Sequence, residues 1–278
     1  MMELTYKNEF GEVGLHGRGG IFSVYEVDGF ELQGRERSLI NFYNSDGYRE
    51  ASSRFGQRIM TISGEVLATA RDELKRAVRV LSHPGLLTVK IKDELREIAV
   101  ADVTFNINKR NGAYKRYVMQ FVADISHFTD CKDNIAGVFL RKNLISKDTY
   151  LPAVFTERYS TGKVENDGDF PTEPIIVINC LRGADQNGDI TIENKTNGGK
   201  IVIEHMLKEG ERLTVDIPNR QIISSIDGDI THQLARGSYL SDMELSCGTN
   251  EFSVQAVDGN RNAEVYLKYR NLYSGVII

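Results

Sequence analysis

The sequence contains no tryptophan and only three cysteines among its 278 residues. Cys131, Cys180 and Cys247 are odd in number and far apart in the chain. A disulfide framework uses an even number of cysteines at short spacing, and a structural zinc site uses paired CxxC ligands, so neither is predicted. We expect three small, buried side chains in a reducing compartment.

The sequence also lacks an excess of positive charge and any long apolar run. Lys and Arg number 34 against 39 Asp and Glu, which gives a formal charge of -5, whereas nucleic-acid binding normally needs a basic field. No segment approaches the ~20 apolar residues that span a bilayer. Met1–Phe10 lacks the basic-then-apolar pattern of a secretory signal. We therefore expect a soluble protein made in the cytoplasm, with no nucleic-acid or membrane partner.

The first half of the chain is dominated by period-two alternation, which is typical of half-buried strands. Alternating apolar residues predict strands over 87–91 and 117–125. The apolar phase slips between Val100 and Val103, which predicts a β-bulge or a bend. Asp28-Gly29 lies between apolar runs and predicts a tight hairpin, because that turn needs positive φ at both central residues.

One amphipathic helix interrupts this pattern over 70–82. Four apolar residues recur there at helical spacing, namely Leu74, Ala77, Val78 and Leu81. We expect Thr69 to cap the start of the helix and Pro84-Gly85 to end it. The first half is therefore predicted to be a sheet system with one helix packed on it.

The second half is predicted to be an antiparallel sandwich. A change of character over 131–174, with short apolar runs, glycine turns and two prolines, places the domain boundary near residue 135, giving domains 1–135 and 136–278. Ile175–Ile178 is a continuous apolar run, suited to a strand covered on both faces. Short alternating strands follow, with turns every ~8–12 residues. Their apolar residues are Ile190, Ile192, Ile201, Ile203, Leu213, Val215, Ile217, Phe252, Val254, Ala256, Val265, Leu267 and Tyr269.

None of the candidate chemical motifs has the spacing that its chemistry requires. His16–Gly20 is glycine-rich, but it lacks the GxxxxGK[ST] pattern of a phosphate loop and no helix follows it. Asp185–Asp189 offers oxygen ligands at alternate positions, as a calcium loop would. Its glycine, however, lies one residue too early for an EF-hand and no glutamate follows at the required distance, so a hairpin turn is favoured. The same holds for Asp167–Asp169. The histidines are scattered and no nucleophile elbow is present. No catalytic, cofactor or metal site is predicted.

Basic residues gather in two places. Arg71, Lys75, Arg76 and Arg79 lie on the predicted helix. They are most simply a solvated face, and they are also our candidate for one half of a charge-complementary subunit contact. The second set, Lys109, Arg110, Lys115 and Arg116, is typical of a solvated hairpin tip.

Several motifs occur in an order that is recognisable. The first half carries 59–67 (IMTISGEVL, taken as strand-turn-strand), the basic helix, 83–89 (HPGLLTV) and 121–130 (FVADISHFTD). The second half carries 166–174 (NDGDFPTEP), 213–216 (LTVD), the turn 248–250 and 266–273 (YLKYRNLY). In this order the chain resembles the distal tail proteins of siphoviruses, with their N-terminal ring domain and galectin-like C-terminal domain. Only 131–152 departs from the family pattern.

The resemblance implies a mainly β fold, with an N-terminal β-sandwich or split-barrel-like domain carrying one helix and a galectin-like sandwich. It implies a non-enzymatic virion protein without a cofactor. Six copies would form a ring at the tail tip that joins the tail tube protein to tail-tip (tail-associated) and receptor-binding proteins, after synthesis in the bacterial cytoplasm. A related protein of a prophage remnant or of a tail-like bacteriocin would look the same in sequence. The alternative is a carbohydrate-binding β-sandwich module, which the absence of tryptophan disfavours although 12 tyrosines are available.

Overall fold

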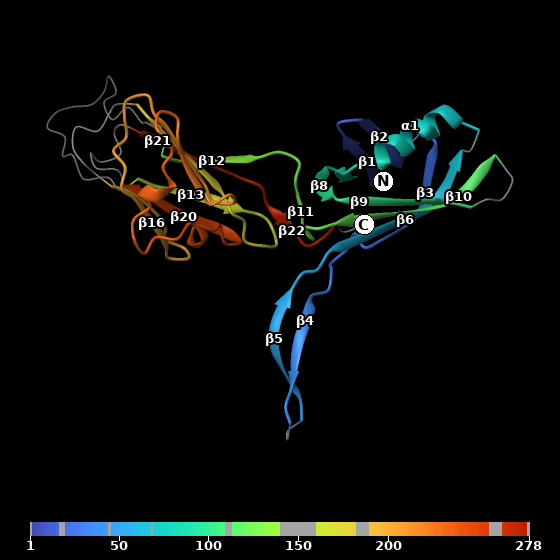
Figure 1. Ribbon diagram of the computed structural model, residues 1–278, viewed down its shortest axis with the longest axis horizontal. Coiled ribbons are helices and arrows are strands. Elements are labelled where there is room, and N and C mark those ends of the chain that lie inside the picture. The colour runs from blue at the N-terminus through green and yellow to red at the C-terminus, as the bar shows by residue number, and fades with distance from the viewer. Residues whose placement is uncertain are drawn as a thin grey trace. The chain divides into compact units, whose positions relative to one another are not determined.

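The computed structural model describes residues 2–16, 20–43, 46–67, 69–108, 113–139, 160–181, 189–255 and 263–276 (Figure 1). The chain divides into two compact units. The first unit consists of Met1–Cys131 together with Tyr273–Ile278, and the second of Lys132–Leu272. The domain limits 1–135 and 136–278 stay a prediction.

The first unit contains two antiparallel sheets around one core. The six-stranded sheet has the order β2 (Gly11–His16), β1 (Met2–Asn8), β7 (Gly85–Ile91), β8 (Glu94–Val100), β11 (Phe128–Asp130) and β22 (Leu272–Tyr273). The four-stranded sheet has the order β3 (Phe22–Asp28), β6 (Arg58–Leu67), β10 (Tyr114–Ala123) and β9 (Asp102–Ile107). Buried side chains from both sheets, such as Leu87 and Val89 on β7 and Met119 and Phe121 on β10, form a continuous apolar cluster.

The phase slip between Val100 and Val103 is a bend at which the chain changes sheets. β8 ends at Val100 in the six-stranded sheet, and β9 begins at Asp102 in the four-stranded one. Between them, the Ala101 amide donates to the Val122 carbonyl at 2.8 Å. The predicted bend is confirmed.

Two predictions about strand limits are wrong. Ile125 is 63% exposed instead of buried, because β10 ends at Ala123. Residues 59–67 form one uninterrupted strand, β6, and not a strand-turn-strand. Gly64 is not a turn but a position in this strand where only glycine fits, because a Cβ there would lie 1.8 Å from the Ser23 carbonyl oxygen. The close approach occurs next to a bulge in β3.

The helix α1 (Arg71–Leu81) forms as predicted, with a small shift of its buried face. Ala77, Val80 and Leu81 are buried, whereas Val78 is exposed. The predicted Thr69 cap is wrong, because the N-cap residue is Ala70 and no side chain caps it. At the other end Ser82 is the C-cap residue, and its hydroxyl donates to the Val78 carbonyl at 2.7 Å. The helix therefore ends just before Pro84, as predicted.

The tight hairpin predicted at Asp28-Gly29 does not form. Instead, the chain leaves β3 there and builds a separate two-stranded hairpin, β4 (Glu36–Asn41) with β5 (Tyr48–Arg54), before it returns as β6. Gly29 has φ +81, and a Cβ on it would lie 2.2 Å from the Ile59 carbonyl oxygen. The glycine is therefore needed for the chain to exit the sheet, and Figure 1 shows the hairpin leaving the sheets of this unit.

The second unit is the predicted antiparallel sandwich. Its six-stranded sheet has the order β12 (Asn134–Phe139), β21 (Ala263–Tyr269), β14 (Ile175–Cys180), β17 (Arg212–Asp216), β18 (Gln221–Ser224) and β19 (Gly228–Asp229). Its four-stranded sheet has the order β13 (Ser160–Asn166), β20 (Gly248–Gln255), β15 (Ile190–Asn194) and β16 (Gly199–Ile203). Those alternating apolar residues predicted from the sequence that the structure describes form its core, and Ile176–Ile178 is buried on both faces. Two short 3-10 helices, η1 (Thr231–Gln233) and η2 (Leu240–Asp242), follow β19.

Three buried asparagines brace one end of this sandwich. Asn166 donates to the carbonyls of Phe170 and Leu245, at 3.0 and 3.1 Å. Asn194 donates to the Asn250 side-chain oxygen at 3.2 Å. Asn166 and Asn250 belong to two of the motifs that carry the family resemblance, so these motifs fix turns through hydrogen bonds from buried amides.

The cysteines differ from the prediction of three buried side chains. Cys180 is buried, Cys131 is half-buried and Cys247 is exposed. Several predicted features lie wholly or partly outside the described residues: the glycine-rich segment after His16, Lys109 and Arg110, most of 131–152, the Asp185–Asp189 turn, and Ala256 with the turn after it. Among the described residues, no helix has the length and apolar character needed to cross a bilayer.

Candidate assembly surfaces and a buried polar network

The four basic residues singled out in the sequence all lie exposed on α1. Arg71, Lys75, Arg76 and Arg79 share the helix with two acidic residues of its first turn, Asp72 and Glu73. The Arg79 guanidinium lies 5.8 Å from the centre of the Phe10 ring, so this side chain also packs on its own unit. The other three are the basic residues of this face that are available to a partner.

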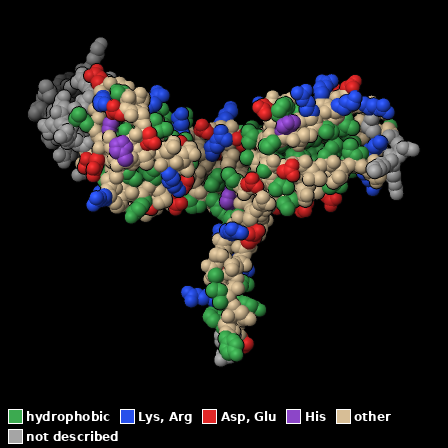
Figure 2. Space-filling view, in the orientation of Figure 1, with side chains coloured by type: hydrophobic (Ala, Val, Ile, Leu, Met, Phe, Trp, Pro, Cys, Tyr) green, Lys and Arg blue, Asp and Glu red, His purple; other side chains and the backbone are tan. Residues whose placement is uncertain are grey.

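The most unusual surface of the first unit is the β4–β5 hairpin. Every residue of β4 is exposed, and so are all but one of β5. Its apolar side chains are Leu39, Ile40, Phe42, Tyr43 and Tyr48, which are 45–98% exposed. Figure 2 shows apolar side chains along this hairpin. A two-stranded hairpin is marginally stable by itself in water, and a long exposed apolar strand pair is an association surface.

The hairpin has two distinct faces. Leu39 pairs with Glu50 and Asn41 with Tyr48, so Leu39 and Tyr48 share one face, because paired residues point to the same side of a ladder. Arg37 lies on that face as well, with its guanidinium 3.8 Å from the Glu50 carboxylate. We call Arg37, Leu39, Tyr48 and Glu50 the hairpin contact face.

The base of the hairpin is held by the buried guanidinium of Arg58. Arg58 Nε donates to the Ser126 carbonyl at 2.6 Å, and Nη1 donates to the carbonyls of Gly29 and Glu31 at 3.0 and 2.9 Å. Nη2 donates to the Ser274 carbonyl at 2.5 Å. Burial lowers the pKa of this guanidinium. Arg58 thus ties both ends of the hairpin, the loop after β10 and the C-terminal segment together.

An open hollow of about 390 Å³ lies on the outward face of the six-stranded sheet of the first unit. We call it the sheet hollow. Its lining includes Lys7, Leu86, Thr88, Leu95, Glu97 and Cys131. Leu86 and Leu95 are 41% and 44% exposed, although leucines on a strand usually face a core. The hollow is therefore a second exposed apolar surface of the same unit.

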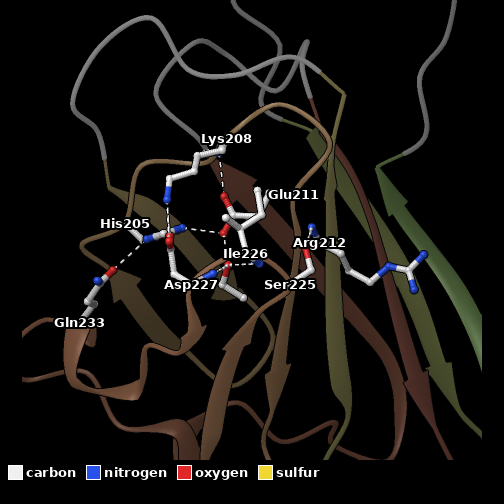
Figure 3. A network of polar contacts seen from close by, with 9 residues as sticks. His205, Lys208, Glu211, Arg212, Ser225, Ile226, Asp227 and Gln233 are labelled. Atoms are coloured by element: carbon white, nitrogen blue, oxygen red, sulfur yellow. Dashed lines mark hydrogen bonds and ion pairs between the residues drawn. The ribbon is translucent and has the colours of Figure 1, made fainter.

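The second unit contains a buried polar network between β16 and η1 (Figure 3). His205 Nε2 lies 2.7 Å from Glu211 Oε1, and His205 Nδ1 lies 2.8 Å from Gln233 Oε1. Glu211 also accepts from the Ser224 hydroxyl at 2.5 Å and from the Lys208 amide at 2.7 Å. The network joins the loop before β17 to β18 and to the 3-10 turn.

The Glu211 carboxyl stays ionised although it is almost completely buried. Burial alone would raise its pKa, but hydrogen bonds from the Lys208 amide, the Ser224 hydroxyl and His205 hold that pKa below its ordinary value. His205, Glu211 and Asp227 offer ligand atoms within 4.8 Å of one another. The Lys208 ammonium, however, donates to both oxygens of Asp227 at 2.6 Å. We therefore assign the network a structural role.

No local pattern in the sequence indicates these features. Arg58 begins an ordinary alternating strand, and its four acceptors come from three separate segments. His205 and Glu211 lie on either side of a turn and have no motif spacing. The β4–β5 hairpin could not be predicted from apolar periodicity, because its strands alternate weakly and its apolar side chains point to solvent and not to a core.

Comparison with known proteins gives a family match for part of the second half of the chain and solved structures of similar fold for the whole chain. Residues 167–273 match the family of the siphovirus-type tail component, C-terminal domain. No curated protein sequence matches the chain. The crystal structure of the Dit protein of phage SPP1, described as a paradigm of the hub adsorption apparatus of phages that infect Gram-positive bacteria, aligns with a TM-score of 0.71 at 13% identity. That alignment covers 98% of this chain and 99% of that one.

A chain of the phage P2 baseplate in its activated conformation with Ca aligns with a TM-score of 0.52 at 9% identity. The alignment covers 99% of this chain and 100% of that one. At these identities the structural likeness shows the fold. Together with the family match, it confirms the resemblance to siphovirus distal tail proteins, and it supports a structural role in a distal tail or baseplate.

Proposed function

We propose that this chain is a non-enzymatic siphovirus distal tail protein, six copies of which close into a ring. In the virion the ring would join the tail tube protein to the tail-tip and receptor-binding proteins. The family match of residues 167–273 and the fold shared with a hub protein support this assignment. The number six rests on the family resemblance alone.

The observation that carries the proposal is the β4–β5 hairpin. Its apolar side chains would be a liability on a monomer, because exposed apolar strands promote association. The Arg58 hydrogen bonds join the segments that lead into and out of the hairpin, so its two ends leave the unit from a fixed place. A protein that works by assembly is expected to keep such an arm for a neighbour.

A ring is a better outcome than a dimer for this geometry. We propose that a neighbour receives the hairpin on a different patch of the same unit, which makes the contact head-to-tail. Such head-to-tail contacts close into rings when the rotation between copies permits. The basic face of α1, with Arg71, Lys75 and Arg76, is proposed as an auxiliary contact that steers copies together.

The proposal is tested by solution mass after one change in the hairpin. The wild-type chain is expected to elute in size-exclusion chromatography with light scattering at a multiple of its 31.3 kDa. Leu39→Asp should shift the protein to the monomer, because it places a charge in an apolar contact. Ile125→Asp, at an exposed position of the same unit, is the control and should assemble normally. If the Leu39→Asp variant assembles to the same mass as the wild type, the proposed role of the hairpin is contradicted.

A further inference from the structure

The sheet hollow is an exposed apolar surface that the proposed function leaves without a role. Leu86 and Leu95 lie on neighbouring strands, β7 and β8, and both point to the outward side of the sheet. Thr88 pairs with Glu97 between them. On the far side of β7, Lys7 of β1 pairs with Leu86. The hollow therefore has the basic Lys7 at its β1 border and the acidic Glu97 on β8.

The hairpin contact face has the matching pattern. Leu39 and Tyr48 supply the apolar part, while Arg37 and Glu50 supply one charge of each sign. Arg37 and Glu50 are 3.8 Å apart and largely exposed, with side-chain exposures of 63% and 45%. Exposed pairs of this kind contribute little stability. Each charge is therefore available to pair with a residue of a partner at small cost.

We propose that the hairpin contact face of one copy occupies the sheet hollow of the next copy. Leu39 and Tyr48 lie against Leu86 and Leu95. The Glu50 carboxylate faces Lys7, and the Arg37 guanidinium faces Glu97. This inference rests on the proposed ring and names both sides of its contact.

The two surfaces together explain why assembly closes. The hairpin and the hollow belong to the same unit but are different patches, so an open row of copies leaves one hairpin unused at one end and one hollow unused at the other. Ring closure buries the last pair. A second copy is a better occupant than an unrelated protein, because this chain itself carries the complementary charges and apolar side chains.

Cysteine cross-linking in the full-length chain tests the contact directly, because Cys131 lines the hollow. The background variant Cys247→Ser removes the exposed thiol of the second unit. In this background, Leu39→Cys treated with a short bismaleimide should give a ladder of covalent oligomers on a denaturing gel. Adding Cys131→Ser should abolish the ladder. Ile125→Cys, which replaces an exposed apolar residue of the same unit outside the hollow, is the matched control and should give no ladder.

Charge substitution in the hollow gives an independent measure. Leu95→Lys should lower the assembled fraction at a fixed concentration at least tenfold, whereas Ile125→Lys should not change it. Wild-type oligomers of normal mass without the Leu39→Cys ladder, or normal assembly of Leu95→Lys, would overturn this contact and leave the ring in place. A wild-type chain that is monomeric at every concentration would overturn both proposals.

Discussion

Arg58 shows how one residue can organise a surface that is made by other residues. Its guanidinium is buried, donates to four carbonyl oxygens and lies 5.0 Å from the centre of the Phe128 ring. The acceptors come from the segment before the β4–β5 hairpin, from the loop after β10 and from the C-terminal segment, while Arg58 itself follows the hairpin. An arginine suits this place because its rigid fork can reach several carbonyls at once.

Replacing Arg58 should therefore destabilise the first unit and loosen the hairpin. We expect Arg58→Met to lower the free energy of unfolding by about 3 kcal/mol, since several buried carbonyls lose a charged donor. Chemical denaturation followed by circular dichroism measures this loss. Arg54→Met, at an exposed arginine on the same hairpin, should change stability by less than about 0.5 kcal/mol. Equal effects of the two substitutions would contradict the role given to Arg58.

Glu211 predicts a pH dependence of the second unit. Its pKa is lower in the folded chain than its ordinary value of 4.5, so the unfolded state binds protons more readily as the pH falls. The stabilisation is fully present above about pH 4.5 and is lost as the pH falls through the lower folded value. Glu211→Gln should cost about 2 kcal/mol at pH 7, because the buried hydrogen bonds lose their charge.

The same comparison at low pH provides the internal check on Glu211. The difference in unfolding free energy between wild type and Glu211→Gln should shrink below pH 4.5, because the carboxyl of the unfolded chain takes up a proton there while the folded carboxyl, with its lower pKa, does not yet. Glu209→Gln, an exposed neighbour, should be indistinguishable from wild type throughout. A constant difference between pH 7 and pH 3 would be evidence against an ionised Glu211 in the folded state.

At the scale of single elements, periodicity predicted those strands that have one buried face. β7, β10 and the strands of the second unit follow their apolar alternation, because burying one face of a sheet fixes its register. Periodicity failed for β4 and β5, whose side chains face solvent on both sides. It also misplaced the buried side of α1, where Val80 takes the place expected for Val78. In that helix the neighbouring strands decide which side is covered.

The basic face of α1 is the candidate interface predicted from the sequence, and its role stays a proposal. Reversing Arg71, Lys75 and Arg76 to glutamate should slow assembly, and most strongly at low salt, because exposed charges act mainly on association rate and are screened by ions. Arg79 is left unchanged because it lies over Phe10. Stopped-flow light scattering at two salt concentrations measures the rate.

A matched control for the helix is available in the second basic cluster. Arg116→Glu changes an exposed basic residue on β10 and should leave the association rate unaltered. If the triple variant on α1 and wild type associate at the same rate at low salt, the helix face is only a solvated surface.

At the scale of the whole molecule, the sequence predicted a β protein in two halves, and the order of its motifs indicated the family. It did not predict that Tyr273–Ile278 returns to the first unit. The Arg96 guanidinium lies 3.2 Å from the centre of the Tyr273 ring, and Val276 is buried and donates from its amide to the Phe30 carbonyl at 2.8 Å. These contacts join residues more than 170 positions apart, which local patterns cannot reveal.

Assembly is the property on which the account of the whole molecule depends. The measurement that tests it most directly is native mass spectrometry of the full-length chain across a concentration series. We predict a complex of six copies of the 31.3 kDa chain, with few intermediates because ring closure favours the complete assembly. A single chain at every concentration, or a closed assembly of another number, would contradict the proposed hexameric hub.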